Sequence, residues 1–291
     1  KGSKGSKGSK GSKGSGVLVT RPHNLLFHRP DGNASAPPPI ASGTDGRQGG
    51  SLPTPLPRLA DLPVQILTPS DHARALWPGW SSDSHGSAWK TLRHRSRPAG
   101  EQERPIALRW PKRSTGAAGA DEPGALAAHL ARERQRLTGE LDRLAGAPDV
   151  DLAVHVFRGW RRADLLAGLT CLVLDFDVPE AKAGTLDERV AAVERHIGRF
   201  LDAAQREAAA DHPHPLPPPN MLVRTGRGYH AYWLFDRFLP AKALPRWQAV
   251  QQMLLERFAH LQPDRSVTDC TRVLRLVGTT NSKVPAEDGQ P

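Results

Sequence analysis

The sequence predicts a mixed α/β domain that contains antiparallel strands and follows a long N-terminal tail. From residue 121 onward, helical and strand-like apolar spacings alternate in the order α-β-β-α-β-β-α-β. Two strand-like segments, 220–225 and 229–235, flank a short glycine turn, which predicts an antiparallel hairpin. We therefore expect one mixed core and not an all-parallel sheet.

Three segments have the apolar spacing of amphipathic helices. Pro123 begins the first and Gly146 ends it, as proline and glycine often do. Thr185 and Glu188 have the spacing of a capping box at the start of the second. The predicted helices span 123–146, 185–210 and 244–261, and the predicted strands span 152–157, 166–178, 220–225, 229–235 and 271–281.

The first 120 residues differ in composition from the rest. Residues 1–15 are five copies of Lys-Gly-Ser, and residues 16–60 are rich in Pro, Gly and Ser, so we expect a disordered tail over 1–60. Residues 61–120 are basic and contain tryptophans, which fits a strand-binding surface. We favour instead a poorly ordered segment or an accessory subdomain that packs its tryptophans. A separate folded domain is expected over 121–291. The tryptophans and basic residues of segment 61–120 are Trp77, Trp80, Trp89, Trp110, Arg93, His94, Arg95 and Arg97.

Charge and cysteine content narrow the class of protein. The net charge is +10, and its excess lies before residue 121, because 121–291 carries 22 basic and 23 acidic residues. A basic tail attracts phosphate backbones, but this alone does not indicate nucleic-acid binding. Two cysteines, Cys171 and Cys270, cannot form a disulfide framework or a four-thiolate zinc site. With no apolar run long enough for a membrane span, we expect a cytoplasmic protein with no membrane partner.

Two aspartates close the apolar segment 172–178. Asp175 and Asp177 are two residues apart, so in a strand they project from one face and Phe176 from the other. Carboxylates this close repel each other unless a cation lies between them, and hard oxygen ligands suit Mg²⁺ or Mn²⁺. A strand end capped by aspartate is the alternative.

A glycine turn with a histidine follows at 225–233. Gly226 and Gly228 flank Arg227, and glycine lets main-chain N–H groups approach a phosphate closely. His230 lies on the following strand, where it could donate to a phosphate or ribose oxygen. An ordinary hairpin turn with a half-buried histidine explains the same pattern.

The third polar stretch, 264–283, combines acids with basic residues. Asp264 or Asp269 could complete a metal site with the first aspartate pair. Arg272 and Arg275 lie on opposite faces of a regular strand, so both could serve one site only through a bend or bulge. Lys283 is a point charge suited to phosphate.

Taken together in this order, the three stretches resemble the archaeo-eukaryotic primase superfamily, in its branch of plasmid and phage replication primases (RepB-like primases or primase-polymerases). The resemblance covers roughly 150–283, and Val277 stands where that branch usually has proline. The matching positions are Asp175 and Asp177 for its first motif, Thr225, Gly226, Gly228 and His230 for its second, and Asp264 (or Asp269), Arg272, Arg275, Gly278, Thr279, Asn281 and Lys283 for its third.

The resemblance implies a primase core, with an RNA-recognition-motif-like antiparallel sheet, flanking helices and a small N-terminal α/β layer. It implies primer synthesis on single-stranded DNA from NTPs or dNTPs by two-metal nucleotidyl transfer. Asp175, Asp177 and Asp264 would be the catalytic metal ligands for Mg²⁺ or Mn²⁺. The nucleotide phosphates would be bound by Thr225, Gly226, Gly228, His230, Arg272, Arg275 and Lys283.

Two other functions remain open. One is a non-catalytic replication initiator of the same fold that binds single-stranded DNA. The other is a different Asp-x-Asp nucleotidyl- or glycosyltransferase, in which the third stretch would have no role. The chain ends soon after that stretch, so we expect a truncated catalytic domain, with a replicative helicase in a following domain or a separate chain.

Overall fold

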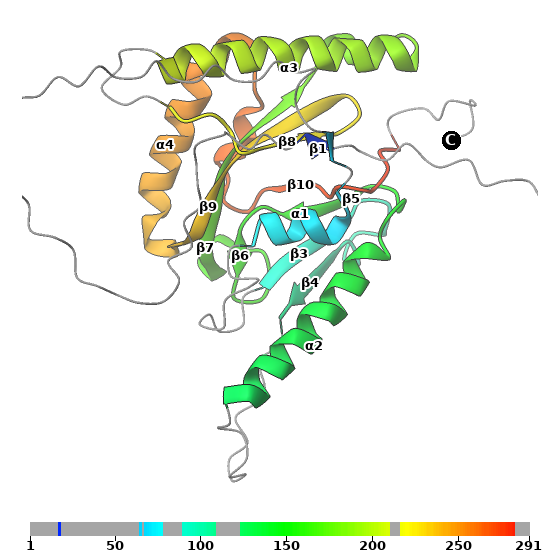
Figure 1. The fold of residues 1–291 in the computed structure, drawn as a ribbon, viewed down its shortest axis with the longest axis vertical. Coiled ribbons are helices and arrows are strands. Elements are labelled where there is room, and N and C mark those ends of the chain that lie inside the picture. The colour runs from blue at the N-terminus through cyan, green and yellow to red at the C-terminus, as the bar shows by residue number, and fades with distance from the viewer. Residues whose placement is uncertain are drawn as a thin grey trace, which may run out of the picture.

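A computed structural model describes residues 17–18, 64–65, 67–77, 89–108, 123–209 and 216–282. In these ranges ten strands form one sheet, in the order β10-β5-β3-β6-β7-β9-β8-β1-β2, with β4 paired to β3. All strand pairs are antiparallel, and helices flank the sheet (Figure 1), so the expected α+β class is confirmed. The strands are β1 Val17–Leu18, β2 Val64–Gln65, β3 Trp89–His94, β4 Glu103–Ala107, β5 Val150–Ala153, β6 Val156–Phe157, β7 Leu166–Asp177, β8 Met221–Arg224, β9 Gly228–Pro240 and β10 Val273–Arg275.

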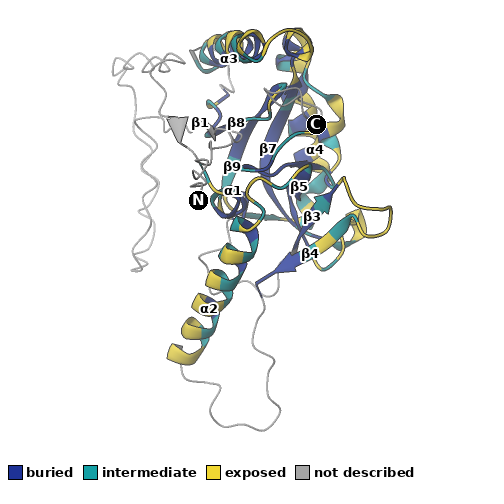
Figure 2. Ribbon diagram, turned by 90° about the vertical axis from the view of Figure 1, so that its right-hand side faces the viewer, coloured by how far each residue is buried: buried dark blue, intermediate teal, exposed yellow. Residues whose placement is uncertain are grey.

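Four α-helices cover the two halves of the sheet. Helices α3 and α4 accompany β7 and β9, whereas α1 and α2 lie beside β3, β4 and β5 (Figure 1). The N-terminal end of α2 extends away from the sheet and is largely exposed (Figure 2). No helix in the described ranges is both long enough and apolar enough to cross a membrane. The helices are α1 Pro69–Ala75, α2 Pro123–Asp142, α3 Leu186–Ala209 and α4 Leu244–Arg257.

The predicted strand 152–157 is two strands, because a lysine side chain enters the gap between them. The buried Nζ of Lys90 donates hydrogen bonds to the main-chain oxygens of Ala153, Val154 and His155, at 3.0, 2.7 and 3.4 Å. Those oxygens are therefore turned toward a side chain and not toward a neighbouring strand. An ammonium has three donors, so three carbonyls satisfy it completely.

The boundary predicted at residue 120 does not separate two units. Strand β3 pairs with β5 and β6, and it therefore joins the N-terminal segment to the same sheet as the later strands. Trp77 is 1% exposed and packs in the core, so it is not part of a strand-binding surface. The buried Lys90 interrupts the apolar pattern of β3 and concealed this strand in the sequence. Trp80 and Trp110 lie outside the described residues, as does most of 1–60.

Helix α4 and the loop after it close one edge of β7. Beyond Gly168 none of the described strands neighbours this edge, since β6 pairs with β7 only as far as that residue. Trp247 Nε1 donates to the main-chain oxygen of Cys171, at 2.8 Å. Gln251 donates to the oxygen of Val173 at 2.6 Å and accepts from its N–H at 3.2 Å. Main-chain groups that would otherwise be buried without partners are thus satisfied by side chains.

The same edge continues into the acidic end of β7. The next outward-facing carbonyl is that of Asp175, and it accepts a hydrogen bond from the main-chain N–H of Asp264 at 2.8 Å. Helix α4 thereby positions the loop that follows it. Three consecutive contacts at every second residue of β7 fix where that loop lies.

Candidate functional site

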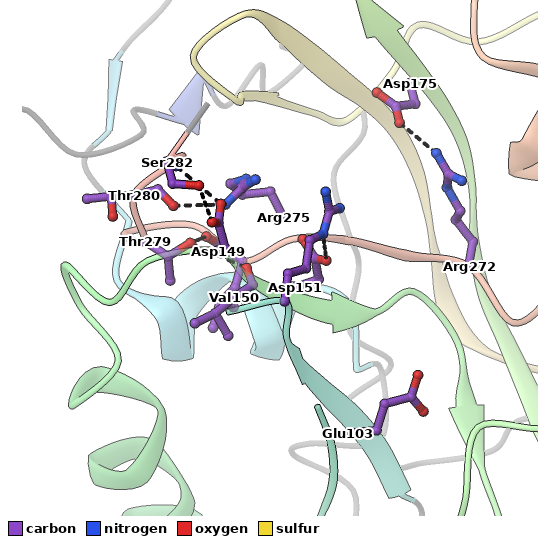
Figure 3. A network of polar contacts seen from close by, with 12 residues as sticks. Glu103, Asp149, Val150, Asp151, Asp175, Arg272, Arg275, Thr279, Thr280 and Ser282 are labelled. Atoms are coloured by element: carbon purple, nitrogen blue, oxygen red, sulfur yellow. Dashed lines mark hydrogen bonds and ion pairs between the residues drawn. The ribbon is translucent and has the colours of Figure 1, made fainter. Parts of the chain in front are cut away.

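Two acids from distant parts of the chain share one arginine. Arg272 Nη2 lies 3.1 Å from Asp175 Oδ2 and 2.6 Å from Asp264 Oδ2 (Asp175 and Arg272 are shown in Figure 3). The Asp175 side chain is 20% exposed, and burial raises its pKa to about 6 although Arg272 opposes the rise. Burial acts to raise the pKa of Asp264 too, but hydrogen bonds from Ser266 and the charge of Arg272 bring it below its ordinary value. The positive charge of Arg272 stabilises the ionised form of both carboxylates.

Asp177 lies on the same strand and has a different partner. Its carboxylate pairs with Lys182 Nζ at 2.9 Å, and the side chain is 55% exposed. Phe176 projects to the opposite face, where it stacks on Tyr229 with ring centroids 4.7 Å apart, as the strand period predicts. In the described ranges no three His, Cys, Asp or Glu side chains lie close enough to hold a metal together.

Asp264 and Asp269 were the two candidates for a third acid beside Asp175 and Asp177, and they lie at different places in the structure. Asp264 lies beside Asp175 through its main-chain N–H and through Arg272. Asp269 instead accepts hydrogen bonds from the N–H and hydroxyl of the nearby Thr271, at 2.8 and 2.9 Å. Asp264, and not Asp269, is therefore the acid next to the first aspartate.

The glycine turn packs tightly against the end of β7. Thr225 N–H donates to the oxygen of Gly228 at 2.9 Å, which closes the turn, and Gly226 has φ +93°. A Cβ on Gly228 would lie 1.9 Å from the main-chain oxygen of Phe176, so no other residue fits there. The two strands are antiparallel, with Asp177 opposite Gly228. The second glycine thus has a packing reason in addition to the phosphate approach that the sequence suggested.

His230 is paired directly with Asp175 across β7 and β9. Its Nε2 lies 3.5 Å from Asp175 Oδ1, and burial followed by the charges of Arg272, Arg275 and Arg95 lowers its pKa to about 3. The imidazole is therefore neutral and carries a hydrogen on one nitrogen.

Tyr232 determines which nitrogen of His230 carries that hydrogen. Its hydroxyl lies 3.2 Å from His230 Nδ1, and burial raises the pKa of Tyr232 well above 10, so the phenol keeps its proton. A buried phenol needs an acceptor, and within the described residues its hydrogen-bond partner is Nδ1, to which we assign the role of acceptor. Nε2 is then the protonated nitrogen, which can donate to an oxygen on the Asp175 side.

Arg275 forms an ion pair with a different acid, Asp149. Its Nη1 lies 3.2 Å from Asp149 Oδ1 and 2.8 Å from the main-chain oxygen of Thr280, and its side chain is 6% exposed. Arg272 precedes the first residue of β10, so the two arginines reach different acids, as Figure 3 shows. Both charges nevertheless lower the pKa of His230.

A second Asp-x-Asp was missed in the sequence. Asp149 accepts hydrogen bonds from both the N–H and the hydroxyl of Ser282, while Asp151 Oδ2 accepts from Arg95 Nε at 2.5 Å. Asp149 has φ +51°, a conformation that aspartate tolerates better than most residues. The spacing Asp149-Val150-Asp151 was the available signal. Here the two carboxylates hold arginines and loop groups.

The third stretch also contacts the second. Asn281 Nδ2 donates to the main-chain oxygen of Thr225 at 3.1 Å. Gly278 has φ +78° and packs against Pro69 of α1, while Val277 N–H donates to His72 Nδ1 at 3.3 Å, a bond that a proline there could not make. Lys283 lies outside the described residues.

The donor chemistry of this region fits a hard divalent cation. Asp175 and Asp264 are adjacent carboxylates whose shared partner is already a cation, and Asp177 lies on the same strand. Oxygen ligands of this kind suit Mg²⁺ or Mn²⁺. A bound ion would take over from Arg272 at these oxygens, and Asp177 would have to leave Lys182 to join it.

Comparison with known proteins gives one partial similarity. The chain is 41% identical over 68 residues to a replication protein from Clostridium perfringens. The matched stretch covers 23% of this chain and 16% of that protein, so the chain spans a small part of its relative. No family model and no solved structure matches the chain.

Proposed function

We propose that this chain acts in DNA replication as a primase or primase-polymerase, which synthesises primers on single-stranded DNA from NTPs or dNTPs. The observation that carries the proposal is the meeting of Asp175, Asp264 and His230, which come from three separate stretches of the sequence. The similarity to a replication protein supports the replicative role. The sheet and flanking helices are compatible with an archaeo-eukaryotic primase core.

Asp175, Asp264 and Asp177 would hold the metal ions. Bound there, Mg²⁺ or Mn²⁺ would stabilise the attacking 3′-oxygen and the leaving pyrophosphate. His230 would donate from Nε2 to a phosphate oxygen of the incoming nucleotide. Burial of the imidazole keeps it neutral, so it orients the phosphate without adding a positive charge.

The charges of three guanidinium groups act on His230, and these groups would neutralise the triphosphate. Arg272 and Arg275 come from the third stretch, and Arg95 follows β3. The Arg95 side chain remains 41% exposed while its Nε is fixed by the buried Asp151. An arginine fixed at Nε can still offer both Nη atoms to a phosphate.

A primer-synthesis assay tests the proposal. Protein, single-stranded DNA template, labelled nucleotides and Mg²⁺ or Mn²⁺ are combined, and Asp175→Asn is compared with Asp236→Asn, a matched change of an exposed aspartate on β9. We expect metal-dependent products that the first variant loses by at least about 100-fold, since a metal ligand contributes several kcal/mol to the transition state.

The assay also separates the alternatives. Full activity of a folded Asp175→Asn protein would overturn the catalytic proposal. Absence of product from the unaltered protein, together with binding of single-stranded DNA, would favour the non-catalytic initiator. Transfer of a sugar from a nucleotide-sugar donor would favour the glycosyltransferase.

A further inference from the structure

The turn between β6 and β7, residues 158–162, presents a tryptophan to solvent. Trp160 is 56% exposed, the highest value among the large apolar side chains of the described residues. Such a ring on the surface loses the free energy of burial unless a partner covers it. A single exposed apolar residue is common on proteins. Exposure alone therefore does not indicate a binding site, and the neighbouring residues must be considered.

Hydrogen bonds hold this turn in one conformation. Arg158 N–H donates to the oxygen of Leu165 at 2.8 Å, and Arg162 N–H donates to the oxygen of Trp160 at 2.9 Å. Gly159 has φ +112°, which glycine alone adopts without strain. The indole is therefore presented on an ordered support, and binding a ligand there does not require the main chain to be ordered first.

Arginines flank the exposed tryptophan in the sequence of the turn. Arg158, Arg161 and Arg162 lie within two residues of Trp160, and Arg158 and Arg162 are exposed. Arg162 pairs with the exposed Asp164 at 2.9 Å, whereas the described residues offer no ion pair to Arg158. A flat aromatic ring beside positive charge complements a base and its phosphate.

Arg161 connects the turn to the acidic site. Its guanidinium donates to the main-chain oxygen of Thr271 and to Glu103 of β4. Thr271 immediately precedes Arg272, which contacts Asp175 and Asp264. Arg161 thus anchors the turn to the residue that precedes the arginine of the candidate site.

We propose that residues 158–162 bind single-stranded DNA, with a base stacked on Trp160 and its backbone phosphates contacted by Arg158 and Arg162. This inference rests on the proposed function in one respect, since the strand bound there would be the template. One exposed aromatic ring with basic sequence neighbours fits an unpaired strand, whose bases are free to stack, and not a duplex.

Fluorescence anisotropy with a short labelled oligothymidylate, without nucleotide or metal, tests this surface. Trp160→Ala should weaken binding by about 5- to 150-fold, the range found for the loss of one stacked base. Trp160→Phe should restore most of the affinity, because it keeps an aromatic face. Met253→Ala, which alters another exposed apolar side chain on α4, should bind as the unaltered protein does.

Two further measurements complete the test: the salt dependence of Kd, and the molecular mass in solution, which reports the oligomeric state. Arg158→Gln should lower the slope of log Kd against log salt by about 0.7, the value for one phosphate of a single strand. Unchanged affinity of Trp160→Ala would overturn the inference and leave primer synthesis untouched as a proposal. A change of oligomeric state in Trp160→Ala would also overturn it, because the ring would then cover a second copy. Weakened binding by a chain that makes no primers would support this surface and contradict the catalytic proposal.

Discussion

Replacing Gln251 tests how helix α4 is attached to the edge of β7. The side chain is fully buried and makes two hydrogen bonds to Val173, at 2.6 and 3.2 Å. Gln251→Met keeps a similar volume and removes both bonds. A buried N–H or C=O left without a partner costs about 1–3 kcal/mol. Because Val173 loses a partner for both groups, we expect the free energy of unfolding to fall by about 2–6 kcal/mol.

Urea unfolding followed by circular dichroism measures this loss. The matched control is Gln252→Met on the same helix, since Gln252 is exposed and bonded only to Glu256 in the described structure. We expect the control to change stability by less than about 0.5 kcal/mol. Equal stabilities of the two variants would refute the reasoning. For a domain of this size each kcal/mol shifts Tm by about 2–4 °C, which thermal melting checks independently.

Three further changes follow from contacts described above. Gly228→Ala should destabilise the protein by about 3 kcal/mol or more in urea unfolding, because its Cβ would meet a main-chain oxygen of β7, whereas Gly198→Ala in α3 meets nothing and should be neutral or stabilising. Tyr232→Phe should change the ¹⁵N NMR signals of His230 from one tautomer to a mixture, and unchanged signals would contradict the assigned hydrogen bond. Burial lowers the pKa of Lys90 from 10.5 to about 7, so the unfolded chain binds the extra proton between those values and stability should rise with pH there, by up to about 1.4 kcal/mol per unit. Lys90→Met should remove that contribution, and equal pH slopes in urea unfolding for the two proteins would exclude it.

Local patterns in the sequence were sufficient to predict most helices and strands after residue 121. The capping box at Thr185 is present, with Glu188 bonded to its N–H at 2.7 Å, because a cap depends on neighbours three residues away. The hairpin and the common face of Asp175 and Asp177 also follow from local rules, turn chemistry and the strand period.

Contacts between distant segments account for what the sequence did not reveal. The place of Asp264 depends on α4 and the edge of β7, 89 residues earlier in the chain (from 175 to 264). Arg95 and Asp151 meet because β3 pairs with β5, which a basic run alone does not indicate. The roles of the two Asp-x-Asp stretches differ for the same reason, since each depends on which cations the fold brings to it.

The shared arginine of the acidic site has a consequence for folding. Carboxylates that meet only around an ion make a protein unfold when a chelator removes that ion. Here Arg272 bridges Asp175 and Asp264 from within the same chain, so a cation of the protein itself opposes their repulsion before any solute binds. The acidic end of β7 carries its own counter-charge, so we expect the domain to fold in solutions free of divalent salts.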